Sequence, residues 1–251
     1  MPETKRIVLL LLVVVPCLLR AQLKVIEIKL GTDINGSTFS FPLVKSSNTA
    51  LAEKINSFLQ NDILANEKIL TDSNEIFENS RFIHSDSNWQ SGYSSIDYTV
   101  EQNSATVFSL SFYFESTGAY AEYYNHAYNF SLQSGDLLTA ENLFTESGFM
   151  QVSDLLIKER SKRIAKWLTE MDTTDQNPDD STYIRETFAE CSADAAINSF
   201  VIKTTGIEFY KQHCFPHAAR AFDIDLDVEF TYKEIAPYLS GKGQRLLAPA
   251  K

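Results

Sequence analysis

The chain has 251 residues, of which 44% are hydrophobic, 12% aromatic and 22% charged. This composition is typical of a globular protein and excludes a disordered, collagenous or coiled-coil chain. Its 22 Lys and Arg against 33 Asp and Glu give a formal net charge of −11. The chain therefore has no excess positive charge with which to bind phosphate backbones, and we expect no nucleic-acid partner.

The first segment reads as a signal peptide over residues 1–21. Two basic residues precede an apolar run at 7–19, and the run ends close to Ala21, where we expect cleavage. A helix of this length spans only about 20 Å, less than the roughly 30 Å core of a membrane, so a permanent anchor is the weaker interpretation. The sequence thus predicts a periplasmic or secreted protein with no membrane span after processing. Lipid attachment at Cys17 is an alternative, although its neighbours do not match the small-residue motif for such anchoring.

The first half of the mature chain contains mostly strand patterns around one amphipathic helix. At 123–133, rings alternate with small polar residues, which predicts a strand covered on one side. The expected strands are 25–30, 37–44, 93–101, 106–115 and 123–133, with a capped helix at 48–66 and a short helix near 75–83.

The second half contains more helix. Its expected elements are a helical turn at 140–144, helices at 148–171 and 183–199, an exposed acidic loop at 172–181, a hairpin of 200–203 with 207–212, and a strand at 224–232. Together the two halves predict an α+β fold, with an antiparallel sheet of hairpins and amphipathic helices packed on it.

Two cysteines, Cys191 and Cys214, remain after removal of the signal peptide. In an oxidising compartment they would persist as a disulfide. By restricting the entropy of the unfolded chain, this disulfide would stabilise the fold by about 3 kcal/mol. Two buried free thiols are the alternative. A bridge requires Cα atoms within roughly 7 Å of each other. Because the sequence spacing does not fix that distance, both states stay open.

Three phrases in the middle of the chain stand in a recognisable order: residues 109–119 (SLSFYFESTGA), 129–135 (NFSLQSG) and 138–144 (LTAENLF). This order resembles the RsiV-like family, and residues 228–239 (VEFTYKEIAPYL) resemble its ending. Phe41-Pro42 and residues 52–56 (AEKIN) resemble the companion domain that usually precedes it. The resemblance implies two consecutive subdomains, a companion at 22–104 and an RsiV-like domain at 105–240, followed by a C-terminal tail at 241–251.

The resemblance implies an extracytoplasmic module, found in a lysozyme-sensing anti-sigma factor and beside the catalytic domain of a peptidoglycan deacetylase. Only six residues precede the apolar run, so we expect no cytoplasmic sigma-binding region, and the deacetylase metal motif is not found. At the turn after Thr117 the sequence has one Gly fewer than the family, and Tyr120 stands where the family has His. A His-dependent role at this turn is therefore in doubt.

No motif of a known catalytic site is found, and we expect no cofactor and no metal. His213, Cys214 and His217 form the densest group of metal-capable residues, but a zinc site needs three or four ligands and a disulfide would remove the thiolate. The acids of 172–180 lack the Gly and terminal Glu of an EF-hand loop. A surface loop is the simpler interpretation of both segments.

The best functional candidates are Tyr120, Glu122 and Tyr123 beside the turn. Phenol rings give a large contact area at little entropic cost, and an acid attracts a cationic partner. We therefore expect a non-enzymatic binding module that recognises an envelope protein, basic and lysozyme-like, or a peptidoglycan fragment. Core packing of these rings is the alternative at the residue level. A hydrolase acting on cell-envelope polymers is the alternative function.

Overall fold

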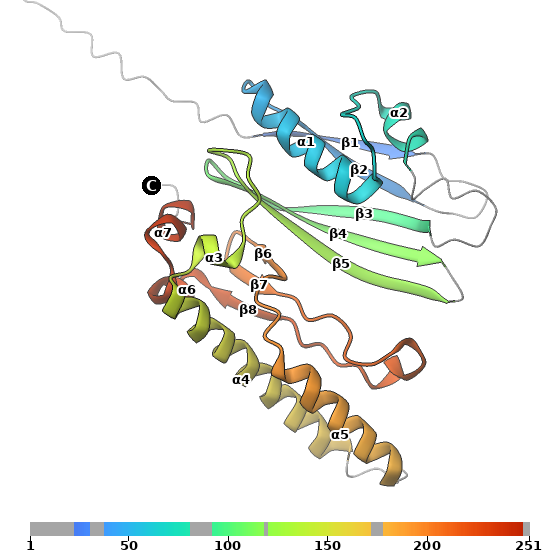
Figure 1. Ribbon diagram of the computed structural model, residues 1–251, viewed down its shortest axis with the longest axis vertical. Coiled ribbons are helices and arrows are strands. Elements are labelled where there is room, and N and C mark those ends of the chain that lie inside the picture. Colours follow the sequence, from blue (N-terminus) through green and yellow to red (C-terminus); the bar gives the residue numbers. More distant parts are fainter. Residues whose placement is uncertain (1–22, 31–37, 81–91, 118–119, 172–177, 248–251) are drawn as a thin grey trace, which may run out of the picture.

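The structure, a computed structural model, describes residues 23–30, 38–80, 92–117, 120–171 and 178–247 (Figure 1). The expected signal peptide with Ala21 and Cys17, most of the acidic loop and Gly118 of the turn lie outside these residues. Within the described ranges, no helix combines the length and the apolar character needed to cross a membrane.

A five-stranded sheet with the order β1-β2-β3-β4-β5 forms one half of the molecule. Neighbouring strands run antiparallel, except that β2 and β3 are parallel where Phe39 pairs with Ile96. The strands are β1 (Lys24–Leu30), β2 (Phe39–Lys45), β3 (Gly92–Asn103), β4 (Val107–Thr117) and β5 (Ala121–Ser131).

Helices α1 (Thr49–Leu64) and α2 (Ser73–Glu78) cover one face of this sheet (Figure 1). Asn48 caps α1 by accepting the Leu51 N–H, and an apolar stripe including Ile55 and Leu59 turns towards the strands. Rings of β4 and β5 fill the space beneath, and the Phe58 ring packs edge-on against two of them. The first hydrophobic core therefore lies between α1 and the five-stranded sheet.

The opposite face of the sheet is covered by the second half of the chain (Figure 1). A three-stranded antiparallel sheet, ordered β6-β7-β8, packs with long helices and forms two further hydrophobic clusters. The elements are α3 (Ala140–Leu143), α4 (Glu146–Met171), α5 (Pro178–Ala193), β6 (Phe200–Ile202), β7 (Gly206–Phe209), η1 (His217–Phe222), β8 (Val228–Thr231), α6 (Tyr232–Ile235), η2 (Ala236–Tyr238) and α7 (Gly241–Leu247).

Asn129 on β5 joins the two sheets. Its Oδ1 accepts the Ile202 N–H at 2.8 Å and the Ser109 hydroxyl at 2.6 Å, and its Nδ2 donates to the Phe200 carbonyl at 2.8 Å. The amide thus pairs with β6 as a backbone group of a neighbouring strand would. Because this side chain and the serines beside it are buried, β5 is covered on both sides here, and the expectation of a strand covered on one side is wrong at this end.

The α+β class is confirmed, and three details differ from the sequence prediction. Helix α5 occupies 178–193 rather than 183–199, and strand β8 has only four residues. Residues 241–247, expected in a tail, form α7, whose Gly243 leaves no room for a Cβ against the Leu143 carbonyl.

The expected subdomain boundary at residue 104 lies between β3 and β4. Strands β3 and β4 pair antiparallel across it, and their side chains share the first hydrophobic core. After β5, residues 131–138 lead from the first hydrophobic core to the second. Within that connection Gly135 adopts φ +73°, a left-handed conformation that favours glycine.

Candidate functional site

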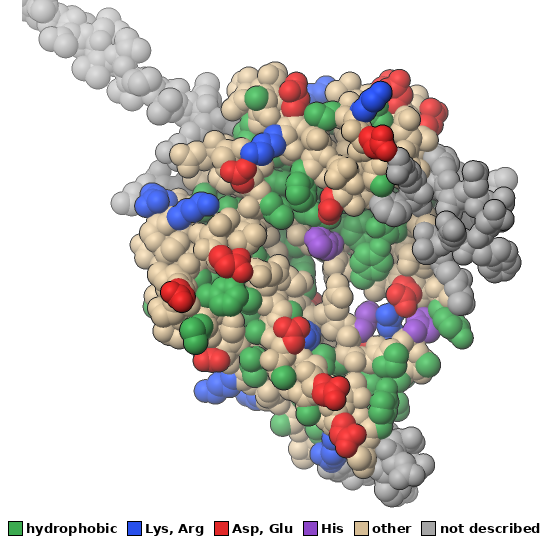
Figure 2. All heavy atoms as spheres, viewed as in Figure 1, with side chains coloured by type: hydrophobic (Ala, Val, Ile, Leu, Met, Phe, Trp, Pro, Cys, Tyr) green, Lys and Arg blue, Asp and Glu red, His purple; other side chains and the backbone are tan. Residues whose placement is uncertain are grey.

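A cleft of about 680 Å³ separates the beginning of β5 from the segment between β7 and β8. Its lining includes residues 122–125 on one wall and residues 210–213 and 223–227 on the other. Figure 2 shows the opening between the two halves of the molecule, with acidic, basic and His side chains gathered beside it. The volume lies in the range of roughly 300 to 1,000 Å³ that is usual for ligand pockets.

Two exposed tyrosines belong to this region: Tyr123 lines the cleft, and Tyr120 contacts η1, the element whose Arg220 also lines it. Tyr120 and Tyr123 are 66% and 60% exposed, so core packing of these rings is excluded. The Tyr120 ring stacks on His217 of η1, with ring centroids 4.5 Å apart. The Tyr123 hydroxyl donates to Glu115 at 3.0 Å, and this hydrogen bond raises the pKa of Tyr123. Both rings are therefore exposed and held in defined positions.

Glu122, the third sequence candidate, links β5 to the opposite wall. Its carboxylate lies 3.4 Å from Nη2 of Arg220 on η1. On the same short helix, the buried Nε of Arg220 and Nδ1 of His217 have no hydrogen-bond partner among the residues that the structure describes. Buried polar groups are normally paired, so this corner retains unused hydrogen-bonding capacity.

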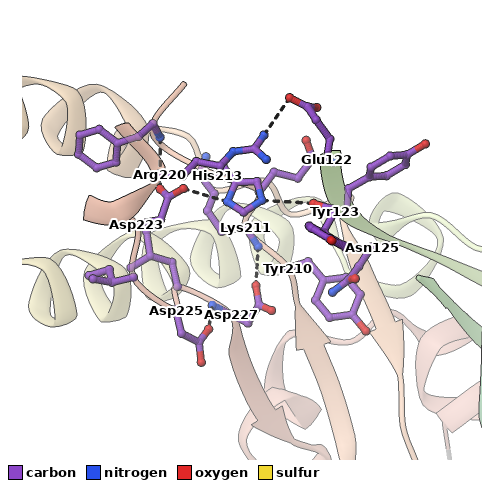
Figure 3. Close-up of a pocket in the computed structure, with 15 residues that line it drawn as sticks. Glu122, Tyr123, Asn125, Tyr210, Lys211, His213, Arg220, Asp223, Asp225 and Asp227 are labelled. Atoms are coloured by element: carbon purple, nitrogen blue, oxygen red, sulfur yellow. Dashed lines mark hydrogen bonds and ion pairs between the residues drawn. The ribbon is translucent and has the colours of Figure 1, made fainter. Parts of the chain in front are cut away.

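His213 lies between Asp223 and Tyr123 and so connects the two walls of the cleft (Figure 3). Its Nε2 lies 3.3 Å from the Tyr123 carbonyl, and its Nδ1 lies 2.9 Å from Oδ2 of Asp223. Both partners are hydrogen-bond acceptors, so the ring donates to both only in its doubly protonated form. Asp223 also accepts the N–H groups of Cys214 and Phe215 at 3.0 and 3.2 Å. The hydrogen-bonded His213 and Asp223 thus connect β5 to the opposite wall of the cleft.

The Cys191–Cys214 disulfide holds this wall to α5. The two Cα atoms lie 5.5 Å apart, within the distance that the sequence analysis required for a bridge. Of the two states left open by the spacing, the structure has the bridged one. Beside the disulfide, Phe215 packs edge-on against Phe188 of α5. The cleft wall is therefore anchored covalently and by aromatic packing.

The acids of the cleft do not form an evident catalytic pair. Asp227 accepts the Lys211 N–H at 2.8 Å, and burial raises the pKa of its carboxyl group. Asp225 accepts the Asp227 N–H at 2.9 Å. The described lining residues include no Ser, Thr or free Cys to act as a nucleophile beside His213, whose two ring nitrogens already have partners.

His213, Cys214 and His217, the group of metal-capable residues in the sequence, each have another partner in the structure. Cys214 is in the disulfide, His213 bonds to Asp223, and His217 stacks on Tyr120. In the part of the chain that the structure describes, no three His, Cys, Asp or Glu side chains are placed to hold a metal ion.

Sequence reasoning located one wall of the site but not the other. The structure places Glu122 and Tyr123 in the lining of the cleft and Tyr120 beside it, against His217. The contributions of Asp223, Arg220 and Lys211 were missed. The only signal for that wall was the dense His213–Cys214 pair. Its meaning depended on contacts with β5, which lies 90 residues earlier in the chain.

Comparison with solved structures supports the fold assignment. The chain is similar to a crystal structure of a DUF3298 family member from Bacteroides fragilis, with a TM-score of 0.56 and 14% sequence identity over 88% of this chain and 94% of that one. A DUF3298 family protein from Pseudomonas aeruginosa matches with a TM-score of 0.48 and 10% identity over 92% of this chain and 96% of that one. No protein-family model and no curated protein sequence matches the chain.

Proposed function

We propose that the chain is a non-enzymatic binding module of the RsiV-like family, acting in the periplasm or outside the cell after removal of residues 1–21. Its ligand is an envelope protein, basic and lysozyme-like, or a peptidoglycan fragment. The observation that carries the proposal is the pair of exposed, positioned rings of Tyr123, which lines the cleft, and Tyr120, which lies beside it against η1. Exposed aromatic rings that are already ordered lose little entropy on binding.

Two further features support the compartment and the class of ligand. A disulfide persists in oxidising compartments such as the periplasm, and Cys191 and Cys214 form one. The net charge of −11 favours association with basic proteins. The resemblance of the fold to a DUF3298 protein agrees with the motifs at 109–144, which lie on β4, β5 and α3.

The test compares the full chain with a Tyr120→Ala/Tyr123→Ala variant in binding to hen-type lysozyme, to soluble peptidoglycan fragments and to an envelope extract. We expect capture to fall by an order of magnitude or more, which corresponds to about 1.4 kcal/mol. The free energy of unfolding should change by about 0.5 kcal/mol or less, because both rings are exposed.

The matched control is Tyr183→Ala, which removes an exposed ring on α5, outside the cleft lining. It should leave capture unchanged. A double variant that binds as the parent does would show that the ligand sits elsewhere. A double variant that loses several kcal/mol of stability would show that the rings support the fold.

A further inference from the structure

The outer edge of β5 is open along the cleft. β5 is the last strand of its sheet, and on its inner side the even-numbered Leu132, just past its end, donates its N–H to the Thr106 carbonyl, next to β4. At the far end, the Ser131 N–H bonds to Asp136 and the Asn129 carbonyl accepts the Leu138 N–H. Because strand groups alternate with a period of two, the N–H and C=O of every odd-numbered residue point outwards. The Tyr123 carbonyl, bound by His213, follows the same rule.

Between these two ends lie Asn125 and Ala127, whose backbone N–H and C=O groups point outwards. These groups bond to no other group among the described residues, and Asn125 lines the cleft (Figure 3). The edge therefore offers up to four backbone hydrogen bonds beside a cleft of about 680 Å³.

This edge lacks the features that protect exposed strands from pairing. Natural proteins protect sheet edges with Lys, Pro or a bulge. The opposite edge strand, β1, carries Lys24 and Lys29. The stretch of β5 from Ala121 to Ala127, which contains the open part, has the sequence AEYYNHA, without Lys or Pro. The eleven pairs that the whole strand makes with β4 run without a register shift. An unprotected, regular edge that opens into a cleft is suited to pairing with another strand.

The charges of the cleft indicate what kind of strand would fit. Lys211, Arg220 and His213 each have an acidic partner, respectively Asp194, Glu122 and Asp223. Asp225 and Asp227 form no salt bridge with a described residue, although the buried guanidinium of Arg160 interacts electrostatically with Asp227. The cleft thus retains negative charge that a basic side chain would neutralise. A second copy of this chain is a poor occupant, because each copy has a net charge of −11.

We propose that an extended peptide segment bearing basic side chains adds as a strand to the β5 edge at Asn125 and Ala127. The backbone bonds provide affinity, as in other cases of strand addition. Alternate side chains of the peptide face Asp225 and Asp227 and provide selectivity. This inference rests on the proposed binding function and specifies the form of the protein ligand that the module takes.

The test uses a capped heptapeptide, Thr-Lys-Val-Lys-Val-Lys-Thr, and the same sequence with Glu in place of Lys. Hydrogen exchange of the full chain should slow at the Asn125 and Ala127 amides in the presence of the basic peptide. The basic peptide should bind at least ten-fold more tightly than the acidic one. Absence of any slowing at millimolar basic peptide would overturn the proposal.

Two variants at one position separate backbone from side chain. Asn125→Pro removes the outward N–H without touching the bonds to β4 and should weaken peptide binding ten-fold or more. Asn125→Ala keeps the N–H and should bind within two-fold of the parent. Methylating two adjacent amides at the centre of the peptide removes an N–H from each of its edges and should abolish binding to the unaltered chain, so the test also holds if the proline variant does not fold.

The outcomes distinguish this inference from the proposed function. If lysozyme or an extract protein is captured through Tyr120 and Tyr123 but Asn125→Pro captures it equally well, the edge inference fails and the function stands. If the basic peptide binds through Asn125 but no envelope protein or glycan is retained, the edge inference stands and the function fails. If the full chain forms a dimer and Asn125→Pro dissociates it, the edge binds a second copy of this chain. That result would overturn the proposal that the edge binds a basic peptide.

Discussion

At the scale of single residues, Asn129 has the most specific structural role. Its buried amide satisfies the Ile202 N–H and the Phe200 carbonyl, which otherwise have no strand on that side. Replacing it with Ala leaves both groups buried and unpaired, at roughly 1 to 3 kcal/mol each. We therefore expect Asn129→Ala to lower the free energy of unfolding by about 3 kcal/mol, measured by urea denaturation.

The control for this prediction lies on the same strand. Asn125 is exposed and its side chain makes no hydrogen bond to a described residue, so Asn125→Ala should change stability by no more than about 0.5 kcal/mol. Asn129→Asp should destabilise at least as much as Asn129→Ala, since a buried carboxylate would face the Phe200 carbonyl. If Asn129→Ala were as stable as the parent, the contact between β5 and β6 would be held by apolar packing alone.

The same residue marks the limit of what the sequence predicts. The alternation in 123–133 placed Asn129 on a small polar face, and polar residues at a period of two normally face solvent. Nothing local shows that another sheet covers this face, because its partners, Phe200 and Ile202, follow about 70 residues later. By contrast, Tyr120 and Tyr123 were found because a turn exposes its rings without long-range help.

At the scale of elements, α4 is fastened by Arg160. This fully buried side chain donates Nε to the Leu226 carbonyl at 2.9 Å and Nη1 to the Ala195 carbonyl at 2.5 Å. Its Nη2 lies 3.2 Å from the carbonyls of Phe209 and Tyr210. Burial lowers its pKa, yet an Arg remains charged at neutral pH. One guanidinium therefore connects α4 to three segments of the chain, and two of them, at Tyr210 and Leu226, form the wall of the cleft.

Arg160→Met should destabilise the protein by about 3 kcal/mol or more, because three buried carbonyls and the part-buried Ala195 carbonyl lose their donor. The stability of Arg160→Lys should lie between those of Arg160→Met and the parent, since an ammonium group reaches fewer of these carbonyls. Lys166→Met on the exposed face of the same helix is the control and should be nearly neutral. Thermal unfolding of the three variants measures the order, and a neutral Arg160→Met would contradict this role.

The elements themselves were predicted in proportion to the strength of their periodic pattern. The strands of the large sheet and helix α4 have long, regular patterns, and their observed bounds lie within a few residues of those expected. Helix α5 begins at Pro178, in a stretch that the sequence analysis assigned to a loop. The assignment failed because Pro is favoured at the first helical position as well as in loops. Helix α7 was missed because its apolar contacts depend on α3.

At the scale of the whole molecule, the two halves are joined closely enough to unfold together. The first core lies above the large sheet and the second below it, and both use residues of β4. The Ser111 and Tyr210 hydroxyls, 2.9 Å apart, and the amide of Asn129 connect the halves through buried polar contacts. Loss of either half would expose these groups and the apolar face packed against them, so we expect a single cooperative transition.

The disulfide tests this expectation, because it lies wholly within the second half. Cys191 and Cys214 are separated by 23 residues, and removing such a cross-link costs about 3 kcal/mol through the entropy of the unfolded chain. We expect Cys191→Ala/Cys214→Ala to lower the stability of the entire molecule by this amount. Its far-ultraviolet circular dichroism and its Trp167 fluorescence, recorded in a Trp89→Phe background, should give the same denaturant midpoint.

Trp167 is a suitable local probe because it packs edge-on against Phe188, in the cluster beside the disulfide. If the halves were independent, the Trp167 transition would shift to lower denaturant while most of the circular dichroism change stayed in place. Two midpoints in the double variant would therefore contradict cooperative unfolding. Coincident midpoints in the double variant combined with separate ones after adding Asn129→Ala would show that the buried amide of β5 is the contact that couples the two halves.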